Sequence, residues 1–296
     1  MMTDPLPTLP GSSQPWSREK RLEFIDFRLA WEGRVNRSDL TSFFGISVPQ
    51  ASADLAEYQK LAPLNTSYDK QAKAYVVEAT FQPLDKGGNP YSLLNAIRQI
   101  DAGVLPKEAT FLGWMPSSSI TRLPSRRIDF TILRTILHCI RTQTQLRFTY
   151  QSMNRRLPTE RCVSPHAIAF DGIRWHLRAY CYERQDFRDF VLARVSCAQS
   201  QTDKGMDPSG DLCWFNELDV VIEPAPHLSD GQRRAIELDY EMVGSRLSIR
   251  TKESMLLYLL QQLPLFGHEG RLRHNQLVLA NEAELQGVFQ RLHIDF

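Results

Sequence analysis

The hydrophobic period of the chain changes at Leu146 from that of a helix to that of a β-strand, and this change restricts the fold more than any other feature. Four runs of alternating apolar and polar residues follow one another with short turns between them: LRFTYQS, RCVSPHAIAFDG, IRWHLRAYCYE and DFRDFVLARV. Closely spaced short strands of this kind are typical of a small antiparallel barrel. The preceding segment predicts a helix from Ile128 to about Thr144, which places Ile132, Ile136 and Ile140 on one face and covers the barrel.

The last third of the chain has a different pattern, in which strand-like and helix-like segments alternate. Strands are predicted at residues 217–224, 245–251 and 275–281, and helices at residues 228–241, 252–263 and 282–292. This alternation predicts a separate small α/β domain.

The N-terminal region has the local signals of a helix-turn-helix. Residues 38–44 and 48–61 have helical patterns, and Gly45 lies in the turn between them. Ser47 suits the N-cap of the second helix, and Pro49 suits its first turn, where the missing N–H costs nothing. A helical hairpin without a role in DNA binding is the alternative interpretation.

A wing after these helices would complete a DNA-binding domain. Two short alternating runs in residues 64–81 predict the wing. The exposed start of the second helix presents Ser47, Gln50 and Ser52 to base edges. Five cations are placed to meet phosphates: Arg34, Arg37, Lys60, Lys70 and Lys73. The region has no net positive charge, so we expect a dimer that binds two half-sites to supply the missing affinity.

These patterns predict a multidomain α+β chain with five parts. The parts are a flexible tail (1–15), a winged helix-turn-helix (16–82), a connector (83–125), a small β-barrel domain (126–202) and a small α/β domain (203–296). The tail is inferred from its prolines, serines and glycine, and the connector from turn-rich sequence such as DKGGNP.

Composition argues against several classes of protein. The longest apolar run, MLLYLL, is far shorter than the ~20 residues of a membrane span. The N-terminus lacks the cationic start and apolar core of a secretory signal. The 5 cysteines are widely spaced and form no CxxC pair, so neither a disulfide framework nor a zinc site is indicated. We expect a cytoplasmic protein with no metal, no cofactor and no membrane partner.

The charge of the middle segment is concentrated in one residue type. Residues 126–202 contain 13 arginines, no lysine and 6 acidic residues, a net charge of +7, whereas residues 203–296 carry −6. Arginine presents a planar fork of donors that binds phosphate or carboxylate in a bidentate manner, and it stacks on rings. This bias favours an anion-binding site. Genomic G+C content, or a structural interface with the acidic C-terminal part, are the alternatives.

The stretch DGIRWHLRAYCYERQDFRDFVLARV, residues 171–195, indicates how such a site would be built. One face of its first strand carries Ile173, Trp175, Leu177, Ala179 and Cys181. The other face carries Arg174, His176, Arg178, Tyr180 and Tyr182. Rings can stack on bases while arginines bind phosphates, so this face suits a nucleotide or a short single strand. The parity of the following turn decides which side chains of the second strand join that face, and both registers remain open.

Acid–base catalysis is another use for the same residues. His166 and His176, with Asp171, Asp186 and Asp189, are possible general acids or bases. No nucleophile elbow, HExxH motif, phosphate-binding loop or dinucleotide fingerprint accompanies them. We therefore expect no catalytic residues and no enzymatic activity, with nucleotide hydrolysis as a less favoured alternative.

The stretch GIRWHLRAYCYERQDFRDFVLARV resembles the core signature of WYL domains. In that family a Trp-Tyr-Leu strand precedes an Arg-containing strand that ends in Arg-Ile or Arg-Val. The triplet here is Trp175-His176-Leu177, so His replaces the central Tyr. FTYQS, Arg161 and VSPHAIAFDG resemble the start of the same domain. With a winged helix before it and an α/β part after it, the chain resembles the BrxR/CapW-type repressors of bacterial phage-defence islands such as BREX and CBASS.

The resemblance implies a homodimeric transcription factor, most simply a repressor, that binds a double-stranded DNA operator with an inverted repeat. It implies that an Sm-like, or SH3-like, WYL barrel senses a nucleotide or oligonucleotide effector, and that the C-terminal part is a WCX domain. The ligand-binding residues carried over by position are Ser164, His166, Trp175, His176, Arg178, Tyr180, Arg188 and Arg194. An RNA-binding protein that uses the barrel directly is the alternative from another class.

Overall fold

A computed structural model describes the chain at residues 17–84, 88–121, 124, 126–263, 265 and 276–294. The chain divides into two compact units, Met1–Pro124 and Ser125–Phe296. The flexible tail predicted for residues 1–15 lies outside the described residues.

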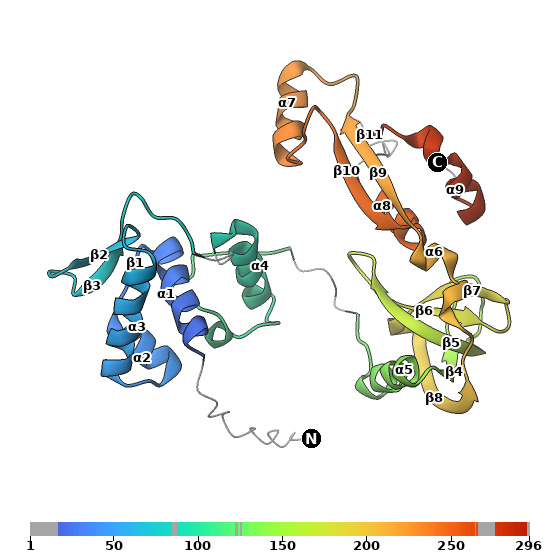
Figure 1. Cartoon of the computed structure of the whole chain (residues 1–296). Coiled ribbons are helices and arrows are strands. Elements are labelled where there is room, and N and C mark those ends of the chain that lie inside the picture. The colour runs from blue at the N-terminus through green and yellow to red at the C-terminus, as the bar shows by residue number, and fades with distance from the viewer. Residues whose placement is uncertain are drawn as a thin grey trace. The chain divides into compact units, whose positions relative to one another are not determined.

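The N-terminal unit begins with helices followed by a β-hairpin (Figure 1). Its first elements are α1 (Arg18–Glu32), β1 (Arg34–Val35), α2 (Arg37–Phe44), α3 (Val48–Leu61), β2 (Thr66–Asp69) and β3 (Ala74–Val77). The strands form a sheet in the order β1-β3-β2, and β2 and β3 project from the helices as a wing (Figure 1). The predicted winged helix-turn-helix is confirmed, and α3 has the predicted bounds.

Local hydrogen bonds fix the ends of the two helices of this motif. Asn36 and Asp39 form a capping box at the start of α2. Gly45 ends α2 with a left-handed φ of 65°, which a residue without a Cβ adopts at little cost. The hydroxyl oxygen of Ser47 then accepts a hydrogen bond from the backbone N–H of Gln50 at 3.4 Å and caps α3. All these signals are adjacent in the sequence, so the motif could be predicted from it.

A buried core and two polar pairs hold α1 against α3. Fully or almost fully buried side chains of the core include Phe24, Ile25, Leu29, Leu40 and Leu55. The guanidinium of Arg21 binds the carboxylate of Asp54 through Nε at 2.6 Å and Nη2 at 3.1 Å. The hydroxyl of Tyr58 donates a hydrogen bond to Asp26 at 2.5 Å. These pairs join residues of α1 to residues of α3 and so fix the orientation of the helix that carries the candidate base contacts.

The region assigned to the connector contains regular structure. α4 (Pro90–Asp101) is followed by the 3-10 turn η2 (Lys107–Ala109). Phe111 packs on the core of the winged helix, with its ring centroid 5.4 Å from that of Phe24. The backbone N–H of Gly113 donates to the carboxylate of Glu32 at 2.7 Å. Residues up to Gly113 are therefore anchored on α1.

The second unit opens with α5 (Phe130–Thr142) and a five-stranded antiparallel sheet. The strands are β4 (Thr144–Tyr150), β5 (Thr159–Phe170), β6 (Trp175–Cys181), β7 (Asp186–Val191) and β8 (Val195–Lys204), with the 3-10 turn η3 (Leu192–Arg194) before β8. Their order is β7-β6-β5-β4-β8. The four predicted strands are present, and β8 adds a fifth. The predicted barrel needs a correction, because within the described ranges no ladder joins the edge strands β7 and β8, and the sheet is not closed.

α5 covers one face of this sheet, as predicted. Ile136 is fully buried, and Ile132 and Ile140 pack beside it against the sheet, whose buried residues include Phe148 and Leu177. Removal of this apolar surface from water contributes about 25 cal/mol per Å² and is the main force that holds α5 on the sheet.

The turn between β6 and β7 settles the register that the sequence leaves open. Cys181 pairs with Asp186 across the turn, so Arg178 pairs with Asp189. Side chains alternate between faces along each strand, so Arg188 lies on the same face as the buried core and not beside Arg178.

A bulge in β5 changes the alternation of side chains at His166. Pro165 pairs with Ala179 and Ala167 pairs with Arg178, so His166 is an extra residue on β5. The bulge places the small side chain of Ala167 beside Arg178. This arrangement leaves space for the long guanidinium side chain and for the segment that covers it.

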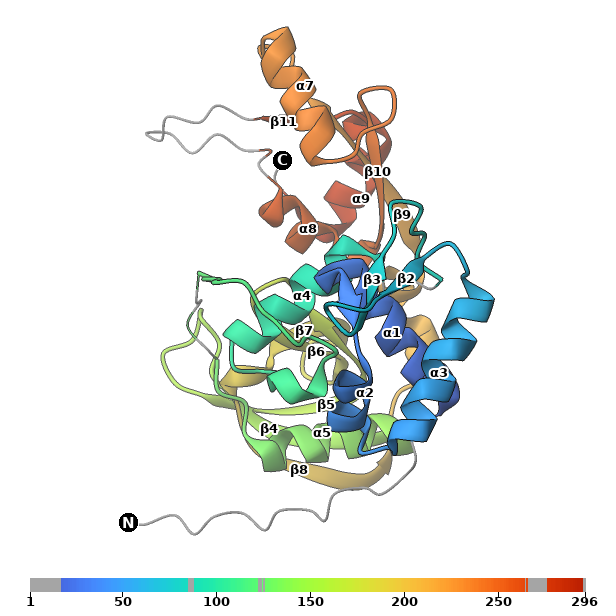
Figure 2. The same ribbon diagram turned by 90° about the vertical axis from the view of Figure 1, so that its left-hand side faces the viewer.

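The C-terminal part forms a second, three-stranded sheet with helices around it (Figure 2). The strands β9 (Glu217–Pro224), β10 (Leu247–Lys252) and β11 (Leu277–Leu279) are antiparallel in the order β10-β9-β11. The helices are α7 (Asp230–Asp239), α8 (Leu256–Gln262), which follows the 3-10 turn η5 (Glu253–Met255), and α9 (Glu282–Leu292). All three predicted strands and all three predicted helices are present. None of the helices in the described part of the chain is long and apolar enough to cross a bilayer.

Residues 205–216 connect β8 to β9 and are called the strap below. The strap contains the 3-10 turn η4 (Pro208–Gly210) and the short helix α6 (Leu212–Phe215), which lies where the chain passes from one sheet to the other (Figure 1). Its backbone and side chains contact the face of the five-stranded sheet opposite α5. The sequence patterns did not predict the strap.

Candidate functional site

The first candidate site is the exposed start of α3. Ser47 and Gln50 are exposed there, and Ser52 is partly buried. The Nε2 group of Gln50 donates to Asp54 at 3.0 Å, and the hydroxyl of Ser52 donates to the carbonyl of Val48 at 3.0 Å. The acceptor oxygens of Gln50 and Ser52 stay available for donors on a base edge.

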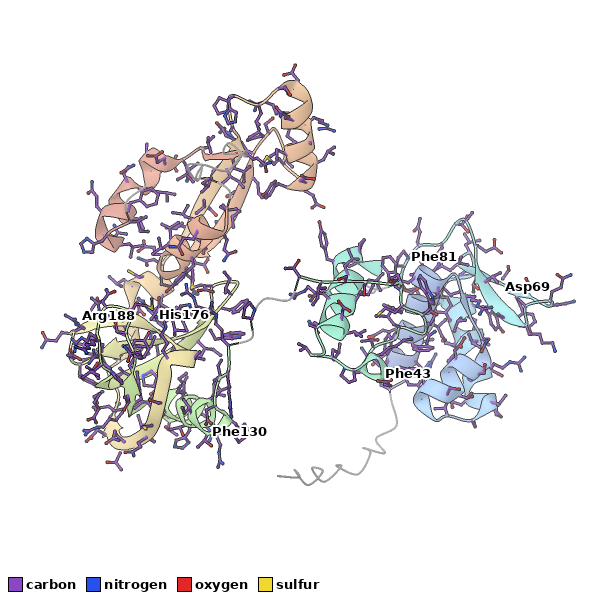
Figure 3. The ribbon with its side chains drawn as sticks, turned by 180° about the vertical axis from the view of Figure 1, so that it is seen from behind. Phe43, Asp69, Phe81, Phe130, His176 and Arg188 are labelled. Atoms are coloured by element: carbon purple, nitrogen blue, oxygen red, sulfur yellow. The ribbon has the colours of Figure 1, made fainter. Side chains whose placement is uncertain are left out.

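Exposed cations surround this helix and extend along the wing. Arg34 lies in β1, Arg37 starts α2, Lys60 lies in the last turn of α3, and Lys70 and Lys73 lie in the turn of the wing. Asp69, labelled in Figure 3, marks the tip of that wing. None of the five cations has an ion-pair partner among the residues that the structure describes. Unpaired cations on a recognition helix and on the elements around it are suited to contact phosphates.

The second candidate site is the polar face of the five-stranded sheet, opposite α5. Of the eight residues that the sequence analysis proposes for a ligand, five lie on this face: Ser164, His166, His176, Arg178 and Tyr180. Figure 3 shows His176 on the side of the sheet toward the C-terminal elements and Arg188 at the outer edge of the sheet.

Arg178 is buried on this face and bound by two carboxylates. Its Nε and Nη2 donate to the two oxygens of Asp211 in the strap, at 2.7 and 2.8 Å, and its Nη1 lies 3.4 Å from Asp189. Burial alone would lower the pKa of Arg178, but the two carboxylates outweigh it and raise the pKa. The guanidinium is therefore charged, and its strongest bidentate position is filled by the chain itself.

Asp211 also receives a hydrogen bond from the bulge residue His166. The distance from Nε2 of His166 to the carboxylate is 2.9 Å, and because an ionised carboxylate only accepts, His166 is the donor. Burial alone would raise the pKa of Asp211, but the bonds from Arg178 and His166 outweigh it and lower the pKa to about 2. Asp211 also accepts from the backbone N–H of Trp214 at 3.3 Å as the N-cap of α6, and it is only 2% exposed, so its negative charge is buried among these donors.

Ser164 holds the beginning of the strap. Its hydroxyl oxygen accepts a hydrogen bond from the backbone N–H of Met206 at 2.8 Å and lies 2.7 Å from the hydroxyl of Tyr182. Gly205 approaches so closely that a Cβ there would lie 3.2 Å from the Ser164 hydroxyl oxygen. Ser164, His166 and Arg178 are therefore all in contact with the strap.

His176 lies at the other end of the polar face and is 3% exposed. Its Nε2 donates to the carboxylate of Asp171 at 2.8 Å, and its ring lies on that of Tyr258 from α8, with centroids 4.9 Å apart. Its Nδ1 is buried without a hydrogen-bond partner within the described ranges. The hydroxyl of Tyr258 donates to Asp189 at 3.2 Å, which connects this end of the face to the carboxylate beside Arg178.

Tyr180 completes a group of rings on the same face. Its ring centroid lies 5.4 Å from that of Tyr182 and 5.3 Å from that of Phe187, both in edge-to-face arrangements. Phe187 also meets His166, at a centroid distance of 5.6 Å. The rings are therefore contiguous with the groups that bind Asp211, an arrangement that suits a nucleotide.

Three of the proposed ligand residues lie elsewhere. Trp175 is exposed on the other face and stacks on Phe170 with ring centroids 4.9 Å apart. Arg188 is exposed at the sheet edge, with its Nη2 3.3 Å from Asp186. Arg194 lies in η3, outside the strands that form the polar face. The structure does not bring these three together with the other five.

Residues of the C-terminal part contribute to this site, and the sequence analysis did not identify them individually. Asp211 and Tyr258 are separated from their partners by 33 and 69 residues. The net charge of −6 in residues 203–296 was the one sequence signal for these residues. It underlies the alternative interpretation that the arginines pair with acidic residues of the C-terminal part. Arg178 does form such a pair, and Asp211 is its partner.

A cleft of about 350 Å³ lies beside the strap. Arg178, Phe187 and Asp189 line it from the sheet, and Glu253 and Arg291 line it from the C-terminal elements. Ligand pockets commonly have volumes of about 300–1,000 Å³, so the cleft has room for one small organic group beside the Arg178–Asp211 pair.

Three family models match successive parts of the chain. Residues 17–99 match the winged helix-turn-helix domain of the BrxR transcriptional regulator, and residues 131–200 match the WYL domain. Residues 217–285 match the C-terminal dimerization domain of the BrxR transcriptional regulator. The matched ranges agree in order with the three folded parts of the chain.

The relatives found align with most of the chain. A protein from Stenotrophomonas maltophilia called DNA-binding transcriptional repressor CapW is 42% identical over 257 residues, 86% of each chain. Proteins of the same name from Pseudomonas aeruginosa and Escherichia coli strain KTE188 are 39% and 38% identical over 97% and 93% of each chain. The solved structure of the proteasome accessory factor PafBC of Arthrobacter aurescens aligns with 98% of this chain and 51% of its own at 16% identity and a TM-score of 0.27, which is too low to support an argument.

Proposed function

Because the chain belongs to the BrxR/CapW family of WYL-domain proteins, we propose that it is a cytoplasmic, homodimeric repressor that binds double-stranded DNA. The repressor role comes from the names of the CapW relatives, and the dimer comes from the description of the C-terminal family model. No activity as an enzyme is needed for this function.

The observation that carries the proposal is the geometry of the N-terminal unit. The start of α3 is exposed, the wing projects from the helices, and the five cations on β1, α2, α3 and the wing are unpaired within the described residues. In a winged helix-turn-helix the second helix of the motif enters the major groove, and cations on neighbouring elements contact the phosphates. Ser47, Gln50 and Ser52 are therefore the proposed base contacts, and Arg34, Arg37, Lys60, Lys70 and Lys73 the proposed phosphate contacts.

We further propose that the polar face of the WYL sheet binds an anionic effector, a nucleotide or a nucleic-acid fragment. Support comes from the contiguous arrangement of Ser164, His166 and Arg178 with the rings of Tyr180 and Phe187. Arginine supplies bidentate donors for a phosphate, and aromatic rings stack on bases. Effector binding would favour a state of the dimer with lower affinity for the operator.

Finer assignments of the fold and of the target also belong to this proposal. The C-terminal part is assigned the WCX fold, and the open five-stranded sheet is assigned as an Sm-like sheet that has not closed into a barrel. The target is proposed to be the promoter of a phage-defence operon, with an inverted repeat as the operator.

A gel-shift titration with DNA from the promoter upstream of its own operon tests the proposal. We expect sequence-specific binding at submicromolar protein, weakened by added salt because phosphate contacts release counterions. Scrambled DNA of the same length is the control. Equal binding to promoter and scrambled DNA, or no binding to either, would contradict the proposed function.

A further inference from the structure

The strap occupies the groups that would bind the anion of an effector. The carboxylate of Asp211 takes the bidentate position on Arg178 and the donor of His166. At the start of the strap, the hydroxyl oxygen of Ser164 accepts from the backbone N–H of Met206. These three residues of the polar face therefore have partners within the same chain.

We propose that Asp211 stands in for the anionic group of the effector, and that an oxyanion bound by Arg178 and His166 displaces the strap from the sheet. This inference rests on the proposed role of the polar face in binding an effector. It adds that the strap keeps the effector site closed and couples this site to the C-terminal sheet.

The chemistry of the pair supports an exchange of one oxyanion for another. A carboxylate and a phosphate both present two oxygens to the planar fork of an arginine, and both accept a hydrogen bond from an imidazole N–H. Asp211 fills the bidentate position on Arg178 and the donor of His166, so an external anion can take both only after Asp211 has moved. Arg178 keeps Asp189 as a partner at 3.4 Å during the exchange, so its buried charge is never unpaired.

The strap is also a stringent competitor, because it is covalently attached. An intramolecular group acts at an effective concentration in the millimolar range or higher. A free phosphate that offers only its oxygens has to compete with that concentration, whereas a nucleotide fragment gains additional affinity by stacking on Phe187 or Tyr180. The cleft beside the strap, lined in part by Phe187, provides the space for such a group.

Displacement of the strap would act directly on the dimerisation part. The strap leads without interruption into β9, the central strand of the C-terminal sheet. The carbonyl of Asn216 accepts from the backbone N–H of Glu253 at 3.1 Å, and the ammonium of Lys252 donates to the carbonyl of Trp214 at 2.8 Å. Movement of Asp211 is therefore expected to displace the first residues of β9 and the adjoining last residues of β10. An effector that binds only the displaced state shifts the equilibrium by its difference in affinity for the two states.

The test measures anion binding and strap protection in the full-length protein. The probes are 5′-phosphorylated dithymidine and inorganic phosphate, which separate a nucleic-acid fragment from a free phosphate as the source of the anion. Binding to the wild type, to Asp211→Asn and to Asp207→Asn is measured by calorimetry. Asp207→Asn is the matched control, because Asp207 lies in the same strap but caps Ser209 at 2.9 Å and touches no group of the polar face.

We expect Asp211→Asn to bind the phosphorylated dinucleotide about tenfold more tightly than the wild type, because it removes a competing charge-assisted hydrogen-bond acceptor. Asp207→Asn should bind as the wild type does. In the wild type, saturation with the dinucleotide should increase hydrogen exchange at the amides of Gly205 and Met206, which bond to Gln143 and Ser164. The exchange measurement needs no variant and so does not depend on the folding of Asp211→Asn.

The outcomes separate this inference from the proposed function. If the dinucleotide binds and releases operator DNA while the strap stays protected, the inference is wrong and the proposed function stands. If the dinucleotide exposes the strap without releasing the DNA, the inference stands and the regulatory role fails. If neither the wild type nor Asp211→Asn binds either probe, no anion takes the place of Asp211 and the inference is also wrong.

Discussion

Asp171 organises the buried end of the polar face through four hydrogen bonds to one carboxylate. The donors are Nε2 of His176 at 2.8 Å, the backbone N–H groups of Ile173 at 2.8 Å and Arg174 at 2.5 Å, and Nε of Arg174 at 3.0 Å. Burial alone would raise the pKa of Asp171. The hydrogen bonds, of which the one from His176 has the largest effect, outweigh burial and hold the pKa well below its usual range. The imidazole that replaces the usual tyrosine of the family is thereby fixed in one tautomer, with Nε2 protonated.

We expect Asp171→Asn to lower the free energy of unfolding by about 1–3 kcal/mol at neutral pH, because it weakens several charge-assisted hydrogen bonds at once. A carboxyl whose pKa is lowered by folding stabilises the protein above its unfolded pKa, and this contribution is lost as the pH falls through the folded pKa. The difference between wild type and variant should therefore shrink as the pH falls below about 4. Urea unfolding of both proteins across this pH range measures the difference in unfolding free energy. A difference that stays constant with pH would contradict the role given to the Asp171 carboxylate.

Among the elements, those with local signals could be predicted and those fixed by distant partners could not. α2 ends at Gly45 and α3 begins after Ser47, as the sequence predicts, because each capping group lies within a few residues of the backbone that it satisfies. The register between β6 and β7 could not be predicted, since it depends on the length of one turn. Asp211 carries no periodic signal, and its partners are 33 and 45 residues away. The face that carries Arg178 could therefore be identified from the sequence, but the segment that covers it could not.

The wing is expected to contribute phosphate contacts without sequence preference. Replacing Lys70 and Lys73 together by Ala should lower the affinity for operator DNA and for scrambled DNA by similar factors, since phosphate contacts carry no base information. The slope of log affinity against log salt should fall in magnitude by about 2, one for each lost contact. Filter binding at several salt concentrations measures both quantities.

A double variant of Arg98→Ala and Lys107→Ala is the matched control for the wing. It removes the same charge from the same unit, but Arg98 bonds to Asn95 in α4 and Lys107 bonds to the carbonyl of Gly113, outside α3 and the wing. If this control weakens DNA binding as much as the wing variant does, net charge alone explains the loss and the wing has no specific role.

At the scale of the whole molecule, DNA binding is expected to depend on all three folded parts and not on the N-terminal domain alone. The winged helix has no net positive charge, so we expect that two copies joined by the dimerisation domain are needed for high affinity. The WYL sheet lies between these parts in the sequence and is joined to the dimerisation part by the strap. In the proposed function, an effector bound at Arg178 acts on DNA binding by changing how two winged helices are presented to one operator.

This dependence on presentation predicts a strong effect of half-site spacing. Inserting five base pairs between the half-sites turns one of them by about half a helical turn, and inserting ten restores its facing, because B-DNA has about 10.5 base pairs per turn. We expect the five-base-pair insertion to lower affinity more than tenfold, to about that of a single half-site, because the second winged helix no longer reaches its site. The ten-base-pair insertion should recover part of the lost affinity if the dimer can span the added length. Gel shifts at one salt concentration compare the affinities for the three operators. A protein that binds the original operator and the one with five added base pairs equally well would not use two half-sites at once, and the proposed dimeric mode of binding would be wrong.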